Sequence, residues 1–230
     1  MPDSRDHFED RSFVDRYVSQ GPPSFMPGHA GVLQMTGVLI REHAGAEARV
    51  LVVGAGGGLE TRALAIQEPA FRFVGVDPAP QMIDLAREVI GEALLDRVEL
   101  VEGTVEDLPD APFDAATCLL VIGLLPDDGS KATLLRRIRA RLTPGAPFVL
   151  ADHCLDRGAT DFDEKVERYG AYARASGVAT EVVDQAMAAL RNNAHLVPAE
   201  RDEQLLDEAG FAHHECFYAG LTWRAWLARA

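Results

Sequence analysis

The sequence contains no long apolar run, few cysteines and no excess of basic residues. No segment has the roughly 18 uncharged apolar residues of a membrane-spanning helix, so we expect no membrane anchor. The N-terminal sequence MPDSRDHFEDR lacks the apolar core of a secretory signal. Cys118, Cys154 and Cys216 are far apart and odd in number, which suits neither a disulfide framework nor a metal site. We therefore expect a cytoplasmic protein without a bound metal.

The charge balance disfavours a nucleic-acid partner. Thirty-six acidic and 22 basic residues give a net charge of −14, whereas nucleic-acid binding depends on cationic surface. The densest basic segment, 131–141, reads as a helix, and we expect its charges on a solvated outer face. A length of 230 residues with 47% hydrophobic residues suits one domain with a small appended cap.

The most informative segment is VLVVGAGGGLET, residues 50–61. Its apolar start predicts a buried strand, Gly54 and Gly56 allow a tight turn, and helical periodicity begins at Leu59. In such a turn the backbone can approach a cofactor closely. A second predicted strand ends at Asp77, whose carboxylate can accept the hydroxyl groups of a ribose.

The same turn discriminates between cofactor classes. A dinucleotide fingerprint requires a third glycine where Leu59 stands, and the Lys-Ser/Thr ending of a phosphate-binding loop is absent. Glu60, near the start of the predicted helix, would repel a pyrophosphate but not a sulfonium or an amino group. The turn therefore favours a positively charged nucleoside cofactor.

Predicted strands and helices alternate, which is typical of a doubly wound, mostly parallel α/β sheet of seven strands. We expect an N-terminal helical cap over 1–45, a Rossmann-like core over 46–155 and 196–230, and a helical insertion over 156–195 that covers the substrate side. The predicted strands are 49–53, 72–77, 98–102, 113–119, 147–152, 211–218 and 221–228. The predicted helices are 6–20, 30–43, 59–67, 80–94, 131–142 and one that starts near Pro198, with a loop over 21–29.

Five segments resemble the ordered motifs of the class I S-adenosylmethionine-dependent methyltransferases. They are VLVVGAGGG, GVDPAPQMIDLAR, EGTVEDLP, FDAATCLLVIGLLPD and RARLTPGAPFVLAD, which span about 49–152. The resemblance implies S-adenosylmethionine as cofactor, S-adenosylhomocysteine as product and a small-molecule acceptor. The Asn/Asp-Pro-Pro-Tyr/Phe tetrad used on nucleobase amines is absent, which disfavours those acceptors.

The resemblance also implies which residues bind the cofactor. Asp77 would accept the ribose hydroxyls, although it could instead cap a helix. Met82 would pack on the adenine, or serve as ordinary helix core. Many members have Asp or Asn at the position of Thr104. The full expected set is Tyr17, His29, Gly54, Ala55, Gly56, Asp77, Pro78, Met82, Thr104, Val105 and Leu119. His153, at the tip of the fifth predicted strand, is a catalytic candidate, and a structural loop histidine is the alternative.

The segments PSFMPGHAGVLQM and AERDEQLLDEAGF resemble, more narrowly, the bacterial branch around carboxy-S-adenosylmethionine synthase. That branch carries a tyrosine where His29 stands and an arginine, which binds the cofactor carboxylate, where about Met187 stands. A methionine cannot form a bidentate pair with a carboxylate, so we infer ordinary S-adenosylmethionine. Arg191, one helical turn further on, is the residue that would overturn this inference.

Three functional hypotheses follow from these observations. The first is methyl transfer to a small molecule. The second is an enzyme with a modified cofactor, such as carboxy-S-adenosylmethionine. The third is a regulator that binds S-adenosylmethionine without catalysis. A homodimer through the N-terminal helix or the insertion is also expected.

Overall fold

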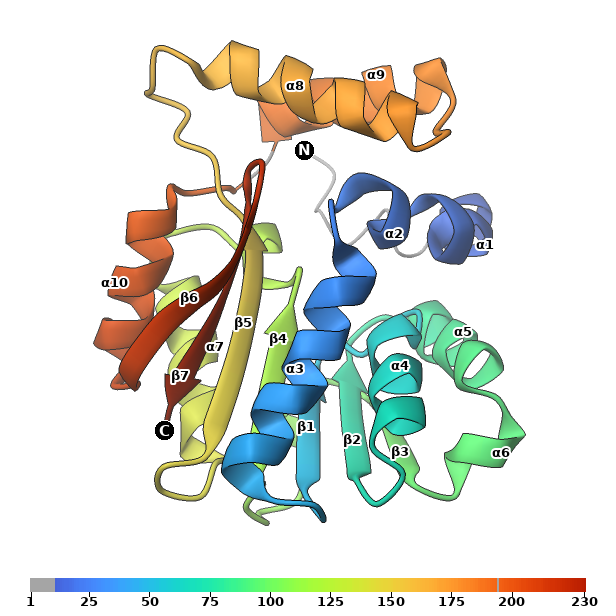
Figure 1. The fold of residues 1–230 in the computed structure, drawn as a ribbon, viewed down its shortest axis with the longest axis vertical. Helices are drawn as coiled ribbons and strands as arrows, with labels where there is room; N and C mark the ends of the chain where they lie inside the picture. Colours follow the sequence, from blue (N-terminus) through green and yellow to red (C-terminus); the bar gives the residue numbers. More distant parts are fainter. Residues whose placement is uncertain (1–10, 194) are drawn as a thin grey trace.

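A seven-stranded sheet in the order β3-β2-β1-β4-β5-β7-β6 runs through the protein (Figure 1). The computed structural model describes residues 11–193 and 195–230, so the predicted helix start over 6–10 lies outside the described residues. β7 runs antiparallel to β5 and β6, and the other pairings are parallel. The strands are β1 (Arg49–Val53), β2 (Arg72–Asp77), β3 (Val98–Glu102), β4 (Ala115–Leu119), β5 (Pro147–His153), β6 (Ala212–Gly220) and β7 (Trp223–Arg229). The predicted doubly wound fold is confirmed.

The centre of the sheet lies where the strand order reverses, between β1 and β4. Val53 pairs with Val76 of β2 on one side and with Cys118 of β4 on the other. The backbone amides of Gly54 and Ala55 both donate to the carbonyl of Val76, at 2.9 and 3.1 Å. The turn after β1 is therefore held at the carboxyl end of the sheet, where doubly wound folds bind their ligands.

Helices cover both faces of the sheet (Figure 1). The central strands are buried on both faces, which explains their continuous apolar sequences. One face packs against α3 (His29–Ala44), α4 (Leu59–Gln67) and α5 (Pro80–Ile90), and the other against α7 (Ser130–Ala140) and α10 (Ala199–Ala209). The shorter elements are α6 (Glu92–Leu95) and the 3₁₀ turns η2 (Val105–Asp107) and η3 (Ile122–Leu124).

Two helical additions lie at the carboxyl end of the strands (Figure 1). The first comprises α1 (Arg11–Gln20) and α2 (Pro22–Phe25), which precede α3. The second comprises α8 (Phe162–Ala175) and α9 (Thr180–Asn193). The segment 21–29 was expected to be a loop, but Pro22 occupies the first turn of α2, where its fixed φ suits a helix. Within the described residues, no helix combines the length and apolarity needed to cross a membrane.

Three further expectations need correction. The predicted helix over 80–94 divides at Gly91, whose φ of 79° interrupts the helical backbone. The strand expected over 221–228 begins at Trp223, because Leu221 is 42% exposed and has a φ of 53° in the turn before β7. Lys131 was expected on a solvated face, but it is fully buried and donates from Nζ to the carbonyl of Ile122 at 2.5 Å.

Candidate active site

The glycine turn after β1 is enclosed by side chains of the protein itself. A Cβ at Gly56 would lie 2.6 Å from Oδ2 of Asp77, and one at Gly54 would lie 2.3 Å from Cγ2 of Val121. Gly54 also has a φ of 72°, which disfavours other residues. The fold alone therefore requires glycine at both positions, and contact of this turn with a cofactor stays a prediction.

Asp77 at the end of β2 is a fixed hydrogen-bond acceptor. Its Oδ2 accepts from the amide of Gly56 at 3.0 Å, and its Oδ1 accepts from the amide of Ala79 at 2.9 Å. Burial raises the pKa of this carboxyl, and the two amides act in the opposite direction. Each carboxylate oxygen keeps lone-pair capacity beyond these bonds. The group can therefore accept ribose hydroxyls while it orders the turn.

The remaining expected adenine-side residues differ in environment. Met82 is 2% exposed on α5 and packs beside Gly56, so its side chain is part of the core. Its contact with the adenine stays a prediction. Pro78 is exposed. The Thr104 hydroxyl and amide both donate to Oδ2 of Asp107 at 2.8 Å, a capping box at the start of η2. Val105 follows and is buried.

The N-terminal helices close over the glycine turn. A Cβ at Gly57 would lie 2.5 Å from Cε1 of Tyr17, so the tyrosine ring sits directly on the turn. Burial raises the pKa of Tyr17, as do the nearby charges of Asp77 and Glu60. Behind the ring lies a pocket of about 30 Å³, which we call the inner pocket. It is lined by Tyr17, Pro22, His29, Leu33, Gly54, Ala55, Gly56, Leu59, Glu60, Leu119 and Leu120.

The structure thus gathers part of the expected set around one pocket. Tyr17 and His29 of the cap face Gly54–Gly56 and Leu119 across it. Asp77 borders the same turn through Gly56. The other expected residues do not line the pocket; they are Pro78, Met82, Thr104 and Val105.

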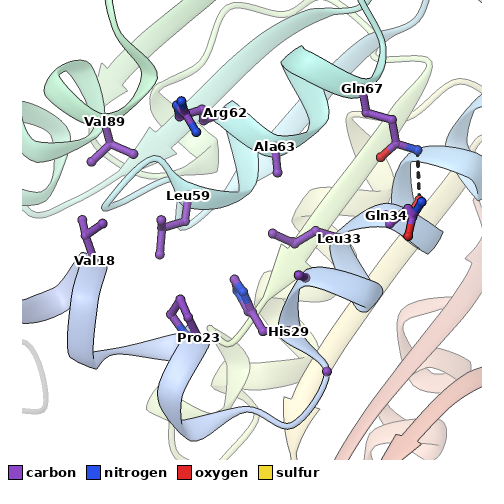
Figure 2. Close-up of a pocket in the computed structure, with 12 residues that line it drawn as sticks. Val18, Pro23, His29, Leu33, Gln34, Leu59, Arg62, Ala63, Gln67 and Val89 are labelled. Carbon is purple, nitrogen blue, oxygen red and sulfur yellow. Dashed lines mark hydrogen bonds between the residues drawn. The ribbon is translucent and has the colours of Figure 1, made fainter. Parts of the chain in front are cut away.

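A larger cavity of about 760 Å³ adjoins the inner pocket (Figure 2). It lies between the N-terminal helices and α4, and His29, Leu33 and Leu59 line both spaces. Arg62 is exposed and faces into it, and Gln67 donates to the carbonyl of Gln34 at 3.0 Å at its edge. The lining is Val18, Pro23, Gly28, His29, Ala30, Leu33, Gln34, Leu59, Arg62, Ala63, Gln67 and Val89. The sequence carried no signal for this cavity, because it depends on how the cap packs.

His153 lies on β5 itself rather than in a loop. Its ring stacks on Trp223 at 4.5 Å and contacts Tyr169 at 4.5 Å, and its Nε2 lies 2.6 Å from Oγ1 of Thr222. Burial lowers its pKa to about 3. Phe25 of α2 packs on Tyr169, at 5.9 Å between ring centroids. His153 is therefore a neutral member of an aromatic cluster that joins the cap, the insertion and the sheet.

Glu60 is a site residue that the expected set omits. Glu60 lines the inner pocket, and its Oε1 is buried without a hydrogen-bond partner of ordinary geometry among the described residues. Oγ1 of Thr117 on β4 is likewise buried without such a partner in the described part of the chain. Burial raises the pKa of Glu60 to about 7, and the nearby Thr117 hydroxyl acts in the opposite direction. An acidic residue in the first turn of a helix was the visible signal. Its burial could not be read from the sequence.

Arg191 and Met187 lie in the insertion, apart from both cavities. Met187 is 3% exposed between α8 and α9. The guanidinium of Arg191 pairs with Asp163 at 3.2 Å and with Glu167 at 2.5 Å, both on α8. Its charge is therefore already balanced within the insertion.

The reversal of strand order, the glycine turn and Asp77 define a doubly wound protein with a site for a nucleoside cofactor. Residues 50–145 match the family model of the methyltransferase domain. Carboxy-S-adenosyl-L-methionine synthase from Chromohalobacter salexigens is 31% identical over 225 residues, covering 94% of this chain and 82% of that protein.

Two solved structures share the fold. Magnesium protoporphyrin IX methyltransferase from Synechocystis, with bound S-adenosylhomocysteine, superposes with a TM-score of 0.67 at 16% identity over 99% of each chain. An N-methyltransferase from Bradyrhizobium japonicum superposes with a TM-score of 0.64 at 16% identity over 99% of this chain and 98% of that one. The chain belongs to the class I S-adenosylmethionine-dependent methyltransferases, in the branch that contains carboxy-S-adenosyl-L-methionine synthase. The predicted family and cofactor class are confirmed.

Proposed function

We propose that this enzyme transfers the methyl group of ordinary S-adenosylmethionine to a small-molecule acceptor. The observation that carries the proposal is the charge of the inner pocket. Glu60 lines it and Asp77 borders it, and its described lining contains no guanidinium. Arg191 pairs with acidic residues of α8 instead. This environment suits a cationic cofactor better than a carboxylated one.

The residues around the turn fit the parts of this cofactor. Asp77 would accept the ribose hydroxyls, and the turn Gly54–Gly56 would face the methionine portion. Met82, Pro78, Thr104 and Val105 would surround the adenine, as the family resemblance implies. When bound, S-adenosylmethionine supplies an already activated methyl group. The protein then has to position the acceptor and exclude water.

The larger cavity is the proposed acceptor site. Its lining is mainly apolar, its volume lies within the range of about 300–1,000 Å³ typical of small-molecule sites, and it meets the inner pocket at His29. Burial lowers the pKa of His29, so its ring is neutral at physiological pH. A neutral imidazole at this junction can take a proton from an O–H or N–H acceptor. We therefore assign the role of general base to His29 rather than to the enclosed His153.

Cofactor entry requires movement of the cap. A pocket of about 30 Å³ is far smaller than a nucleoside cofactor requires, and the Tyr17 ring rests on Gly57. We propose that residues 1–45 act as a cap whose first helices open and reclose, with 156–195 as the insertion on the substrate side of the core. The Tyr218 hydroxyl donates to the carbonyl of Pro27 and ties the loop before α3 to the last hairpin.

Synthesis of carboxy-S-adenosylmethionine is the second candidate function. The 31% identity to an enzyme of that name favours it. The two functions are distinguished by incubating the protein with S-adenosylmethionine, an acceptor library and a panel of carboxylic acids that can lose their carboxylate, and weighing the products. A methyl group added to an acceptor supports our proposal. A carboxylate gained by the cofactor itself would replace it with the second candidate.

Oligomeric state and location are part of the proposal. We propose a cytoplasmic homodimer that uses the N-terminal helix or the insertion. Light scattering on the purified protein and fractionation of the native cells test these two points. A monomer, or recovery outside the cytoplasm, would contradict them.

A further inference from the structure

Glu60 is a half-buried acid at the inner pocket. It stands in the first turn of α4, and its Oε1 is shielded from solvent without a hydrogen-bond partner of ordinary geometry among the described residues. Burying a carboxylate without compensation is costly, so such groups persist where they serve a ligand or a function. Oγ1 of Thr117 on β4, the hydroxyl that acts to lower the pKa of Glu60, is also buried and has no partner of ordinary geometry within residues 11–193 and 195–230. Both groups lie at the switch point between β1 and β4.

Among the described residues, no cationic side chain lines the pocket around Glu60. The titratable groups that face it are Tyr17 on α1, His29 on α3, Asp77 on β2 and Cys118 on β4. Tyr17 and Cys118 hold their protons because burial raises the pKa of each, and burial lowers the pKa of His29. The acids at this pocket are therefore Glu60, which lines it, and Asp77, which borders it, and its described lining contains no positive side chain.

We propose that Glu60 is the counter-ion for the positive charge of the cofactor's methionine portion, its ammonium or its sulfonium group. This inference rests on the proposed use of S-adenosylmethionine. Glu60 then has a binding role, because its carboxyl group releases its proton when the cationic ligand binds. It also supplies a specificity: a carboxylate attached to the cofactor sulfur would meet Glu60 as a like charge.

Proton release should accompany binding. In the free protein Glu60 is partly protonated near pH 7, and a bound cation favours its ionised form. Affinity for S-adenosylmethionine should therefore increase from pH 6 to pH 8. Asp77 also holds its proton more tightly than usual, so a Glu60→Gln variant is needed to separate the two carboxyl groups.

Calorimetric titration with S-adenosylmethionine and S-adenosylhomocysteine in two buffers of different ionisation enthalpy tests the proposal. Glu60→Gln should lower the affinity by about 10- to 100-fold and abolish most of the proton release. An equal loss for both ligands identifies the ammonium group, and a greater loss for S-adenosylmethionine identifies the sulfonium. Glu68→Gln is the matched control, since Glu68 is a buried acid at the other end of α4 that pairs with Arg41 at 2.7 Å.

The outcomes separate this inference from the proposed function. If the wild type binds S-adenosylmethionine without releasing protons, or if Glu60→Gln binds it as tightly, the counter-ion role is refuted and the cofactor assignment stands. If the wild type binds neither ligand, the counter-ion role and the cofactor assignment are both refuted. Even if the variant does not fold, binding of S-adenosylmethionine by the wild type without proton release refutes the inference.

Discussion

Asp202, Asp152 and Lys131 form a buried charged cluster between the sheet and helices α7 and α10. Asp202 and Lys131 are fully buried, and Asp152 is 2% exposed. Oδ1 of Asp202 and Oδ2 of Asp152 have no hydrogen-bond partner within the described parts of the chain, 11–193 and 195–230. One lysine faces two carboxyl groups, so ionising both leaves a negative charge uncompensated in a medium of low dielectric.

The stability of the protein should therefore fall as the pH rises. Burial, and then the charge of Asp152, raise the pKa of Asp202 from 3.8 to about 8. Between those values the folded state holds a proton that the unfolded chain has released, so stability decreases with pH and becomes constant above about pH 8. At about 1.4 kcal/mol per pKa unit, the raised pKa values of Asp202 and Asp152 correspond to a loss on the order of a few kcal/mol between pH 5 and pH 8.

Asp202→Asn removes this titration while it keeps the shape of the side chain and an acceptor for the Cys154 thiol, which now donates to Oδ2 at 3.3 Å. The free energy of unfolding is measured by urea titration at constant ionic strength. The difference between the variant and the wild type should shift in favour of the variant by about 2–4 kcal/mol between pH 5 and pH 8. Glu200→Gln, at an exposed acid of the same helix, is the control, and its free energy of unfolding should have the same pH dependence as that of the wild type. Parallel curves for Asp202→Asn and the wild type would refute the reasoning.

Three other substitutions test the assigned roles. Asp77→Ala should weaken S-adenosylmethionine binding at least tenfold in calorimetry, because it removes the ribose acceptor and the partner of the Gly56 amide; unchanged affinity would refute the assignment. His29→Ala should lower turnover of the identified acceptor at least tenfold with cofactor affinity retained, and an undiminished rate would remove it as the base. His153→Ala should lower the free energy of unfolding by about 2–4 kcal/mol, because it opens a cavity between aromatic rings; a loss of turnover without a loss of stability would contradict its structural role.

The parallel half of the sheet could be predicted closely from the sequence. The bounds expected for 49–53, 59–67, 72–77 and 98–102 are those of the structure. The strands β1 and β2 are largely apolar and buried, Gly54 follows β1, and β2 and β3 end at acidic residues. The periodicity therefore changes sharply at the ends of these elements.

The environments of several charged residues depend on tertiary packing and could not be predicted from the sequence. Lys131 belongs to a run of basic residues, and only the position of η3 and α10 shows that it is buried. Arg191 lies one turn from Met187, but its partners on α8 are distant in the sequence. Glu60 differs from a solvated first-turn acid only by its burial under the cap.

The site was predictable to a similar degree. The tips of the strands could be identified because the carboxyl ends of parallel strands meet at one edge. The two cavities and the junction at His29 required the placement of α1–α3, which no local pattern encodes.

The most direct test of the central claim is calorimetric titration of the wild-type protein with S-adenosylmethionine, after native mass spectrometry has shown which ligand it carries from the cell. Our account predicts micromolar or tighter binding of S-adenosylmethionine, with any carried ligand being S-adenosylmethionine or S-adenosylhomocysteine. Recovery of a carried cofactor heavier by a carboxylate, or the absence of binding to S-adenosylmethionine, would contradict it.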